Sequence, residues 1–414
     1  MKKNIEDLKR IIAGKKVYIW GAMIVGQGVC RALERYNIPV AAFLDSSESL
    51  QGRLALGYPI LPARKIIKEQ PLDEQVIVVS SGHYDLEIEM NCIEAGLIKN
   101  THYLMSYDLN DIDPSVDISG VCNLRCISCP RGNMKGHAAA GFMTSDEYRP
   151  VLSKLLRELP FLGSIQLYTW GEPLLNKHLP EIIRITSEAR VLAALSSNLN
   201  VEGGYQEVVE AKPDWFKISA SGFGESYEIT HTGGKWSRFL RNVNELADLR
   251  ERFHPDMQIV LNYHLYKHNI GDDYRNMEEL CRRLGFIFRP SPAYLYPLDN
   301  VRDYVDGKPL SKEAGRTIEL LLMGLDEGIA KSLLRKRNRC PEERCLPITW
   351  DRKVRFCGVY YRPYITDDFL STPLEEILQK RIASDFCREC RERGLHQFTG
   401  VYLAEKIINP DRVV

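Results

Sequence analysis

The sequence has no excess of charge of either sign. Its 55 Lys and Arg residues balance 55 Asp and Glu residues, and the formal net charge at pH 7 is +0. Nucleic acids and anionic membranes are bound through basic surfaces, which shift this balance. The overall charge therefore predicts neither a nucleic acid nor a membrane as a partner.

A long apolar run is also missing, although a membrane-spanning helix needs about 20 consecutive apolar residues. The charged start Met1-Lys2-Lys3 does not resemble a secretory signal. Both absences favour the cytoplasm, a reducing compartment in which clustered cysteines bind metal instead of forming disulfides.

The 11 cysteines are unevenly distributed along the chain. Eight of them fall into two groups, one between residues 122 and 129 and the other between residues 340 and 390. The remaining three stand alone in predicted helices and are interpreted as small buried apolar residues: Cys30, Cys92 and Cys281. The two groups are the candidate metal sites.

The composition is that of a folded protein, with 44% hydrophobic and 27% charged residues. A chain of 414 residues buries more than one hydrophobic core, and the length predicts two or three domains.

The first 110 residues carry the pattern of a Rossmann-like half. A short β-rich run, Lys16 to Trp20, is followed by a glycine-containing turn and a helix, and a second strand ends in Asp45. Helix N-terminal amides can bind a phosphate, and an acidic residue in this place can bind a ribose. Met23 occupies the place of the second glycine, however, so a purely structural domain with an empty cleft remains an equal alternative.

Short β-rich runs and amphipathic helices then alternate to about residue 290. Six such units predict a parallel sheet curved into a partial barrel, with functional residues at the carboxyl ends of its strands. The predicted strands are 115–119, 164–168, 191–196, 215–219, 258–263 and 286–289.

Three cysteines follow the first of these strands, in the spacing Cys-x3-Cys-x2-Cys: Cys122, Cys126 and Cys129. Three thiols can hold one face of an iron–sulfur cube, and because full ligation takes four, one iron stays open for chemistry. A zinc site that lacks its fourth ligand, or three unrelated buried thiols, are the alternatives.

The loops after the next three strands are rich in polar residues and glycine. They contain Trp170 to Asn176, then Ser196-Ser197-Asn198, then Ser221-Gly222-Phe223. The carboxylate of Glu172 can bind an amine, and the hydroxyl and amide groups can bind a carboxylate or a ribose. All of these loops belong to the same edge of the barrel as the cysteine loop.

These motifs resemble those of the radical S-adenosylmethionine (SAM) enzymes, in the branch with a C-terminal SPASM or twitch extension. The resemblance covers about residues 115 to 395. It rests on the order and spacing of the cysteine motif and of three further blocks: Tyr168 to Asn176, Ser196 to Asn198, and Ile218 to Gly222.

The resemblance implies that Cys122, Cys126 and Cys129 hold a [4Fe-4S] cluster whose open iron is chelated by SAM. An external one-electron reductant of the flavodoxin or ferredoxin type would reduce the cluster, and SAM would be cleaved to methionine and a 5′-deoxyadenosyl radical. The implied SAM-binding residues are Gly171, Glu172, Pro173, Ser197, Asn198 and Ser219, with Glu172 binding the methionine amine. Two departures from the family pattern are Ser128, where an aromatic residue is common, and Thr232, where an arginine is common.

The second group of cysteines follows a predicted helix from Lys312 to Asn338. Cys345 and Cys357 lie at the two ends of a predicted β-hairpin, and Cys387 and Cys390 form a Cys-x2-Cys pair. Four thiolates suit either zinc or a [4Fe-4S] cluster. The resemblance implies one auxiliary [4Fe-4S] cluster, fully ligated by the protein and suited to electron transfer, with Cys340 as a spare or competing ligand.

The expected fold is therefore α/β, in three domains. Residues 1–110 would form the Rossmann-like domain, 111–310 a partial (β/α)6 TIM-like barrel of the radical SAM type, and 311–414 a cysteine-rich twitch or SPASM-like extension.

The expected function is hydrogen abstraction from a small polar substrate, sugar-like or nucleotide-linked, giving dehydrogenation or epimerisation. The N-terminal domain resembles those attached to sugar-modifying enzymes, which supports this substrate class. A maturase of ribosomal peptides and a non-enzymatic zinc-binding scaffold are the alternatives. The sequence selects no catalytic base among four candidates near the strand ends: His231, Tyr263, His264 and Arg289.

Overall fold

The computed structural model describes residues 4–404, except residues 49, 70, 82–83 and 135–139. The chain forms two compact units. Unit 1 comprises residues 1–113, 152–165 and 185–193, and unit 2 comprises residues 114–151, 166–184 and 194–414. Domain boundaries at residues 110 and 310 remain a prediction. No helix in the described part of the chain is both long enough and apolar enough to cross a bilayer.

Unit 1 contains a six-stranded sheet in the order β3-β4-β2-β1-β5-β6. All neighbouring pairs are parallel except the short hairpin β3–β4. The interior strand β5, between β1 and β6, is buried along its whole length, as expected for a parallel strand covered on both faces. The strands are β1 (Lys16–Trp20), β2 (Val40–Asp45), β3 (Leu54–Ala55), β4 (Tyr58–Pro62), β5 (Gln75–Val79) and β6 (Tyr103–Met105).

The helices of unit 1 pack apolar side chains against this sheet in two hydrophobic clusters. Helix α1 begins with a capping box, in which Asn4 accepts from the Asp7 backbone and Asp7 accepts in return. The helices are α1 (Ile5–Ile12), α2 (Ile24–Arg35), α3 (Ala63–Glu69), η1 (Leu72–Glu74), α4 (Asp85–Glu94) and α5 (Ser106–Leu109).

Helix α2 also contacts the later segments of unit 1. The Arg35 guanidinium donates to the backbone carbonyls of Arg190 (2.7 Å), Pro160 (3.1 Å) and Leu162. A Cβ atom on Gly28 would lie 3.1 Å from the backbone of Gly163, so two glycines meet where these segments touch. The sequence reading did not anticipate these contacts.

A nine-stranded sheet, formed by strands between residues 113 and 366, has the order β12-β11-β10-β9-β8-β7-β13-β14-β15. Its first six strands are neighbours in sequence order and are joined by helical crossovers, which confirms the predicted α/β fold built of six β/α units. The strands are β7 (Asp113–Asp117), β8 (Ser164–Gln166), β9 (Leu192–Ser197), β10 (Trp215–Ala220), β11 (Gln258–Leu265), β12 (Ile287–Pro292), β13 (Cys345–Thr349), β14 (Val354–Arg355) and β15 (Tyr364–Thr366).

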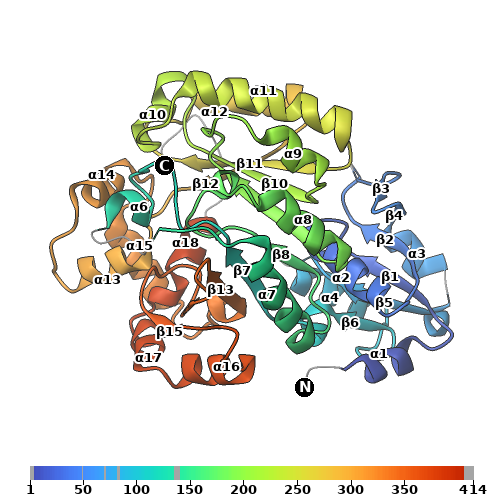
Figure 1. The fold of residues 1–414 in the computed structure, drawn as a ribbon. Helices are drawn as coiled ribbons and strands as arrows, with labels where there is room; N and C mark the ends of the chain where they lie inside the picture. Colours follow the sequence, from blue (N-terminus) through green and yellow to red (C-terminus); the bar gives the residue numbers. More distant parts are fainter. Residues whose placement is uncertain (1–3, 49, 70, 82–83, 135–139, 405–414) are drawn as a thin grey trace. The chain divides into compact units, whose positions relative to one another are not determined.

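Amphipathic helices cover the outer face of these strands, and α9 and α11 lie beside β10 and β11 (Figure 1). Helix α11 buries Phe239, Val243 and Leu246 at helical spacing. The helices are α6 (Pro130–Asn133), α7 (Ser145–Glu158), η2 (Pro173–Leu175), α8 (Leu179–Glu188), α9 (Tyr205–Glu210), η3 (Gly224–Ser226), α10 (Tyr227–Thr230), α11 (Trp236–Phe253) and α12 (Asp272–Leu284).

The C-terminal part contains the antiparallel hairpin β13–β14, whose first strand is the sheet neighbour of β7. The single helix predicted over 312–338 is wrong, because the chain leaves the helix at Leu321 and starts a new one after Gly324. The helices here are α13 (Leu298–Val305), α14 (Lys312–Leu320), α15 (Leu325–Leu334), η4 (Pro341–Arg344), α16 (Leu374–Ala383), α17 (Asp385–Glu392), η5 (Leu395–Gln397) and α18 (Phe398–Ala404).

Candidate active site

The cysteine loop follows β7 and is anchored by its apolar residues. Leu124 and Ile127, between the cysteines, are buried at 1% and 2% exposure. The Arg125 N–H donates to the Thr232 carbonyl (2.9 Å), and the Ile127 N–H donates to the Thr230 carbonyl (3.2 Å). These contacts fix a backbone that has no regular secondary structure of its own.

The structure places the three predicted cluster ligands close enough to influence one another electrostatically. Burial raises the pKa of Cys122 to about 12 and that of Cys129 to about 11, and it raises the pKa of Cys126 well above its ordinary value. Within the described residues, no three His, Cys, Asp or Glu side chains are already spaced as metal ligands. The three thiols are half-buried and lie in one region of the barrel edge.

Gly132 in α6 is required by the tight packing of this loop. A Cβ atom there would lie 2.2 Å from the Cys126 carbonyl oxygen and 2.4 Å from that of Arg125. Sequence reasoning did not single out this glycine, since it lies outside the cysteine spacing.

Glu172 lies in the turn before η2, and its side chain is only 2% exposed. Its carboxylate accepts from the Asn198 N–H (2.9 Å) and from the Leu174 N–H (3.2 Å). Burial raises its pKa to about 7, while these hydrogen bonds and one from Ser197 act in the opposite direction. Among the described residues no Lys or Arg pairs with this carboxylate, so it is a buried acid that lacks a cation.

Backbone contacts join the turn of Glu172 to the cysteine loop. The Glu172 N–H donates to the Val121 carbonyl (2.8 Å). Gly171 packs so closely that a Cβ atom there would lie 1.6 Å from the Ser119 carbonyl oxygen. Only glycine fits this position, and Pro173 then occupies the first turn of η2.

The predicted residues after β9 and within β10 lie near the same loops. The Asn198 side-chain amide lies 3.6 Å from the Cys122 sulfur and donates to the Asn123 side chain (3.0 Å). The Ser197 hydroxyl accepts from the Leu199 N–H (3.0 Å). Ser219 has its hydroxyl 3.5 Å from that of Ser196. Asn198 thus contacts the cysteine loop directly, Ser197 hydrogen-bonds to Glu172, and Ser219 contacts the end of β9.

Asp117 is a positioning residue that the sequence reading missed. Its buried carboxylate accepts from the backbone N–H groups of Thr169 (3.2 Å), Trp170 (3.0 Å) and Gly171 (3.2 Å). It therefore holds the turn that ends in Glu172 against the end of β7. The sequence feature that could have identified it is an acidic residue within a predicted apolar strand, five positions before Cys122.

The four candidate bases have different surroundings. Tyr263 is fully buried and its hydroxyl donates to the Asn269 carbonyl (2.8 Å), which is a structural role. His231 is buried, contacts the Ser221 hydroxyl (3.2 Å) and stacks on a tyrosine ring, and burial lowers its pKa to about 4. His264 and Arg289 instead lie on the more accessible face of the sheet.

Asp45 of unit 1 uses both carboxylate oxygens within its own chain segment. One oxygen accepts from the Ala22 N–H (3.1 Å), and the other accepts from the Ser47 N–H (2.8 Å). Each carboxylate oxygen can accept a further hydrogen bond. The arrangement is therefore compatible with both interpretations of this Rossmann-like segment.

The second group of cysteines lies around one cavity in the C-terminal part of unit 2. Four thiols contribute to its lining: Cys340, Cys357, Cys387 and Cys390. Cys345 lies beside it, with its sulfur 3.8 Å from a Cβ atom placed on Gly358, and hydrogen-bonds to the half-buried carboxylate of Glu342. Cys340, expected as a spare or competing ligand, lines the cavity together with three of the four predicted ligands, and the choice of four among the five thiols stays a prediction.

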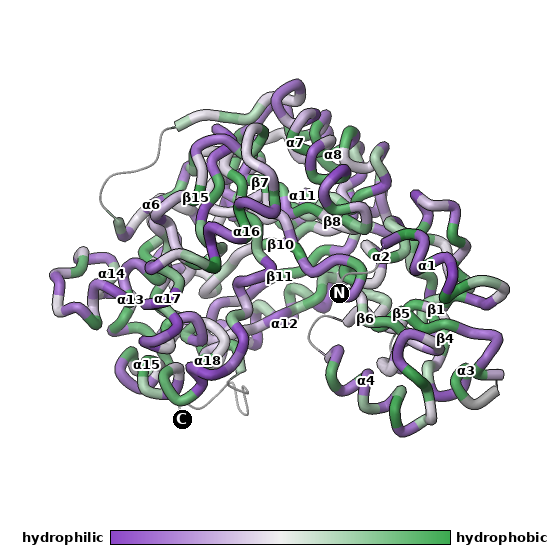
Figure 2. Tube along the Cα trace, turned by 90° about the horizontal axis from the view of Figure 1, so that it is seen from below, coloured by the Kyte–Doolittle hydropathy of each residue, from purple (hydrophilic) through white to green (hydrophobic). Residues whose placement is uncertain are grey.

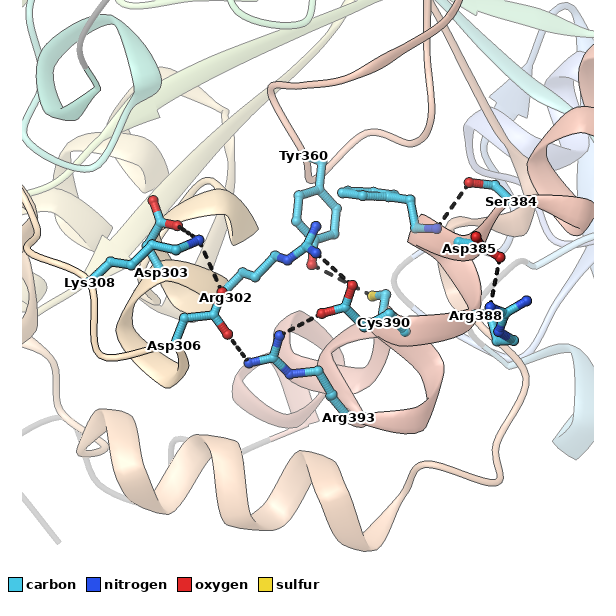
Figure 3. A network of polar contacts seen from close by, with 12 residues as sticks. Arg302, Asp303, Asp306, Lys308, Tyr360, Ser384, Asp385, Arg388, Cys390 and Arg393 are labelled. Carbon is cyan, nitrogen blue, oxygen red and sulfur yellow. Dashed lines mark hydrogen bonds and ion pairs between the residues drawn. The ribbon is translucent and has the colours of Figure 1, made fainter.

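Ion pairs hold the helix that carries the Cys-x2-Cys pair against α13 (Figure 3). Glu389 pairs with Arg302 (2.6 Å) and with Arg393 (2.9 Å), and Arg393 also pairs with Asp306 (2.6 Å). The Tyr360 hydroxyl donates to the Cys390 sulfur (3.7 Å). The C-terminal half of helix α17, which carries Cys390, is therefore held against α13 and Tyr360.

Comparison with known proteins finds no family model that matches the sequence. Solved structures with a similar arrangement of elements include several with AdoMet, or S-adenosylmethionine, bound. One is BtrN in complex with AdoMet and 2-DOIA, with a TM-score of 0.42 and 16% identity over 70% of this chain and 90% of that chain. Another is anSMEcpe with bound AdoMet, with a TM-score of 0.44 and 14% identity; the match covers 67% of this chain and 82% of that chain. A third is SuiB from Streptococcus suis bound to S-adenosylmethionine, with a TM-score of 0.42 and 13% identity; the match covers 74% of this chain and 78% of that chain.

Proposed function

We propose that this chain is a radical SAM enzyme that abstracts hydrogen from a small polar substrate. The observation that carries the proposal is the buried carboxylate of Glu172, which has no cation of its own and is held by Asn198 beside Cys122. An ammonium group supplied by a ligand would compensate this charge, because a buried carboxylate is costly unless it is paired.

The residues present fit an iron–sulfur cluster with an open position. Three thiols on one anchored loop leave one of the four iron positions without a protein ligand. Buried thiols with raised pKa values require a positively charged partner to become thiolates, and a metal cluster provides one. Cys122, Cys126 and Cys129 are the proposed ligands.

When the cluster is reduced, the cluster and SAM together would supply a 5′-deoxyadenosyl radical for hydrogen abstraction. The protein contributes the rest. Glu172 binds the methionine amine, and Ser197, Asn198 and Ser219 bind polar groups of the cofactor. Gly171 and Pro173 set the turn that keeps Glu172 in place.

The C-terminal cavity is proposed to hold one auxiliary [4Fe-4S] cluster, with Cys345, Cys357, Cys387 and Cys390 as ligands and Cys340 competing for one position. A cluster with four protein ligands has no open iron, so its role would be electron transfer. This favours a dehydrogenation, in which the substrate radical gives up an electron, over an epimerisation. The initial electron would come from an external reductant of the flavodoxin or ferredoxin type.

Two alternative functions can be distinguished from this proposal, one by the metal content of the protein and the other by its N-terminal fold. A zinc-binding scaffold would contain zinc and no iron. One of the similar solved structures is SuiB bound to precursor peptide SuiA. A maturase of ribosomal peptides would have to bind a leader peptide. Such binding usually adds a strand to a sheet edge, whereas in the described part of unit 1 the sheet ends in the two-residue strand β3 and the three-residue strand β6.

Anaerobic reconstitution of the full chain tests the proposal. We expect about eight iron atoms per chain, an iron–sulfur absorption spectrum, and formation of 5′-deoxyadenosine from SAM with dithionite. Cys126→Ala should abolish 5′-deoxyadenosine and leave about four iron atoms per chain. Cys281→Ala, at a buried cysteine outside both groups, is the control and should keep all three properties. Zinc in place of iron, or unchanged SAM cleavage by Cys126→Ala, would refute the proposal.

A further inference from the structure

One face of the barrel sheet is polar in its C-terminal half. In β10 the buried residues Phe216 and Ile218 alternate with the half-buried Lys217 and Ser219. Strand β11 repeats this alternation toward its end, and Figure 2 shows it as changes between green and purple along both strands. A packed barrel interior carries bulky branched residues at such positions. This face therefore serves a ligand and not a core.

The strand register brings two cations onto this face. Ser219 is the partner of Asn262, and Asn262 is the partner of Arg289, so these three side chains share a row. Lys217 lies one row closer to the start of β10, next to Ser196 of β9. From the spacing of strands and residues, the Cα atoms of Lys217 and Arg289 lie roughly 12 Å apart. Two long side chains can span that distance to one small group.

No carboxylate on the described part of this face neutralises the two cations. Lys217 and Arg289 form no ion pair there, and the Lys217 ammonium lies over the Tyr168 ring, 4.7 Å from its centroid. The carboxylate of Asp117, at the end of β7, is already engaged by three backbone N–H groups. Asn262 also has a buried side-chain oxygen with no hydrogen-bond partner, an acceptor that suits a hydroxyl group of the same ligand and not its charged end.

The cofactor site lies directly above these rows. Ser196, beside Lys217, immediately precedes Ser197 and Asn198, and its hydroxyl is 3.5 Å from that of Ser219. A molecule whose charged end is held by the two cations would extend along the polar face toward the cysteine loop.

We propose that the substrate carries an oxyanion, a phosphate or a carboxylate, bound between Lys217 and Arg289 with Asn262 beside it. This inference rests on the proposed function, since it assigns the substrate class of the same site. Lys217 and Arg289 neutralise the oxyanion and offer it N–H donors, and the neutral end of the substrate is left to face the cofactor. Sugar phosphates and sugar acids both satisfy this description.

Binding measurements on the reconstituted full chain with SAM present test the inference. The probes are glucose 6-phosphate, gluconate and glucose, titrated by calorimetry. At least one anionic probe should bind about tenfold or more tightly than glucose, because hydrogen bonds to charged groups are strong. A preference for the phosphate or for the carboxylate identifies which oxyanion is used. The absence of any anionic preference in the wild-type protein would overturn the proposal without need of a variant.

Variants test which side chains cause the preference for anionic probes. Lys217→Gln and Arg289→Gln should each remove the anionic preference, whereas Lys217→Arg should retain it. Arg283→Gln, at the outer helix α12, is the matched control and should bind as the wild type does. An anionic preference that survives in the double variant would contradict the proposal.

Two further readouts separate this inference from the proposed function. SAM affinity should be unchanged in Lys217→Gln; an equal loss for SAM would show that the lysine binds the cofactor carboxylate and would overturn the assignment. SAM cleavage by the wild type tests the radical chemistry independently. Cleavage without anion binding refutes the substrate class alone, whereas a protein without iron refutes the proposed function.

Discussion

Gly171 is the point at which the end of β7 meets the turn that carries Glu172. Its hydrogen faces the Ser119 carbonyl oxygen, which would stand 1.6 Å from a Cβ atom. The carboxylate of Asp117 binds the N–H of this glycine and of the two residues before it. Shape and hydrogen bonding therefore act on the same short turn, and together they decide where the Glu172 carboxylate lies.

Gly171→Ala should push these two segments apart. Overpacking costs about 1–3 kcal/mol, and we expect that loss in the free energy of unfolding together with a clear loss of SAM affinity. Urea unfolding and SAM titration measure the two effects. Gly315→Ala is the control, because no atom lies within 4 Å of a Cβ there, and it should be neutral or slightly stabilising in α14. Wild-type SAM affinity in Gly171→Ala would show that the contact is not needed.

Asp117→Asn keeps the size of the side chain but replaces one acceptor oxygen with a donor. One or more backbone N–H groups should lose their partner, at a cost of about 1–3 kcal/mol. We expect a lower denaturation midpoint and weaker SAM binding, measured as for Gly171. The exposed Asp367→Asn serves as the control and should change neither quantity. Unchanged SAM affinity in Asp117→Asn would argue against a positioning role.

At the scale of elements, the order of strands and helices in the barrel followed from the sequence. The six β-rich runs appear as β7 to β12 within a few residues of the predicted bounds, because strongly periodic segments reveal their type locally. The helix predicted over 312–338 failed at Gly324, where the chain restarts as α15. The pairing of β13 with β7 was not foreseeable, since nearly 230 residues separate the strands and nothing local encodes a neighbour.

The candidate site shows the same division between local and distant information. Spacing identified the cysteine loop, and resemblance to a family suggested Glu172 and Asn198. Asp117 could not be recognised, because its role depends on backbone groups more than fifty residues away. The place of Cys340 in the cavity was equally hidden, since five thiols within fifty residues leave the choice of four to the fold.

The short helix η4 connects Cys340 and Cys345, so either thiol is near enough to serve as the fourth ligand of the proposed auxiliary cluster. Cys340→Ala and Cys345→Ala should each retain most of the iron, and the double variant should lose about four iron atoms per chain. Cys357→Ala should already lose them alone. Iron analysis of the reconstituted variants provides the measurement. Complete loss in one of the first two single variants would show that its thiol is a dedicated ligand.

At the scale of the whole molecule, the C-terminal extension completes the barrel sheet. Strand β13 continues the sheet at β7, the strand whose end leads into the cysteine loop (Figure 1). Helices α15 and α18 belong to a hydrophobic cluster that also includes Tyr266 and Leu295, next to β11 and β12. The predicted boundary at residue 310 therefore passes through a shared sheet and a shared core of unit 2.

Removal of residues 311–414 should leave the edge of β7 unpaired and expose this cluster. Unpaired strand edges promote association between chains, and we expect a truncated protein that aggregates or forms large oligomers. Size-exclusion chromatography and circular dichroism compare it with the full chain. A monomeric, cooperatively folding product ending at residue 310 would contradict this expectation and would make the barrel an independent domain.

The continuity of β13 with β7 also limits how such a protein can be engineered. The hairpin that starts at Cys345 shares a sheet with the strand that precedes Cys122. A change in the length or twist of the hairpin would be transmitted through the hydrogen-bonded ladder to the cysteine loop. Exchange of C-terminal extensions between relatives would therefore have to include the strand beside them, and the transferable part is larger than the cysteine motif suggests.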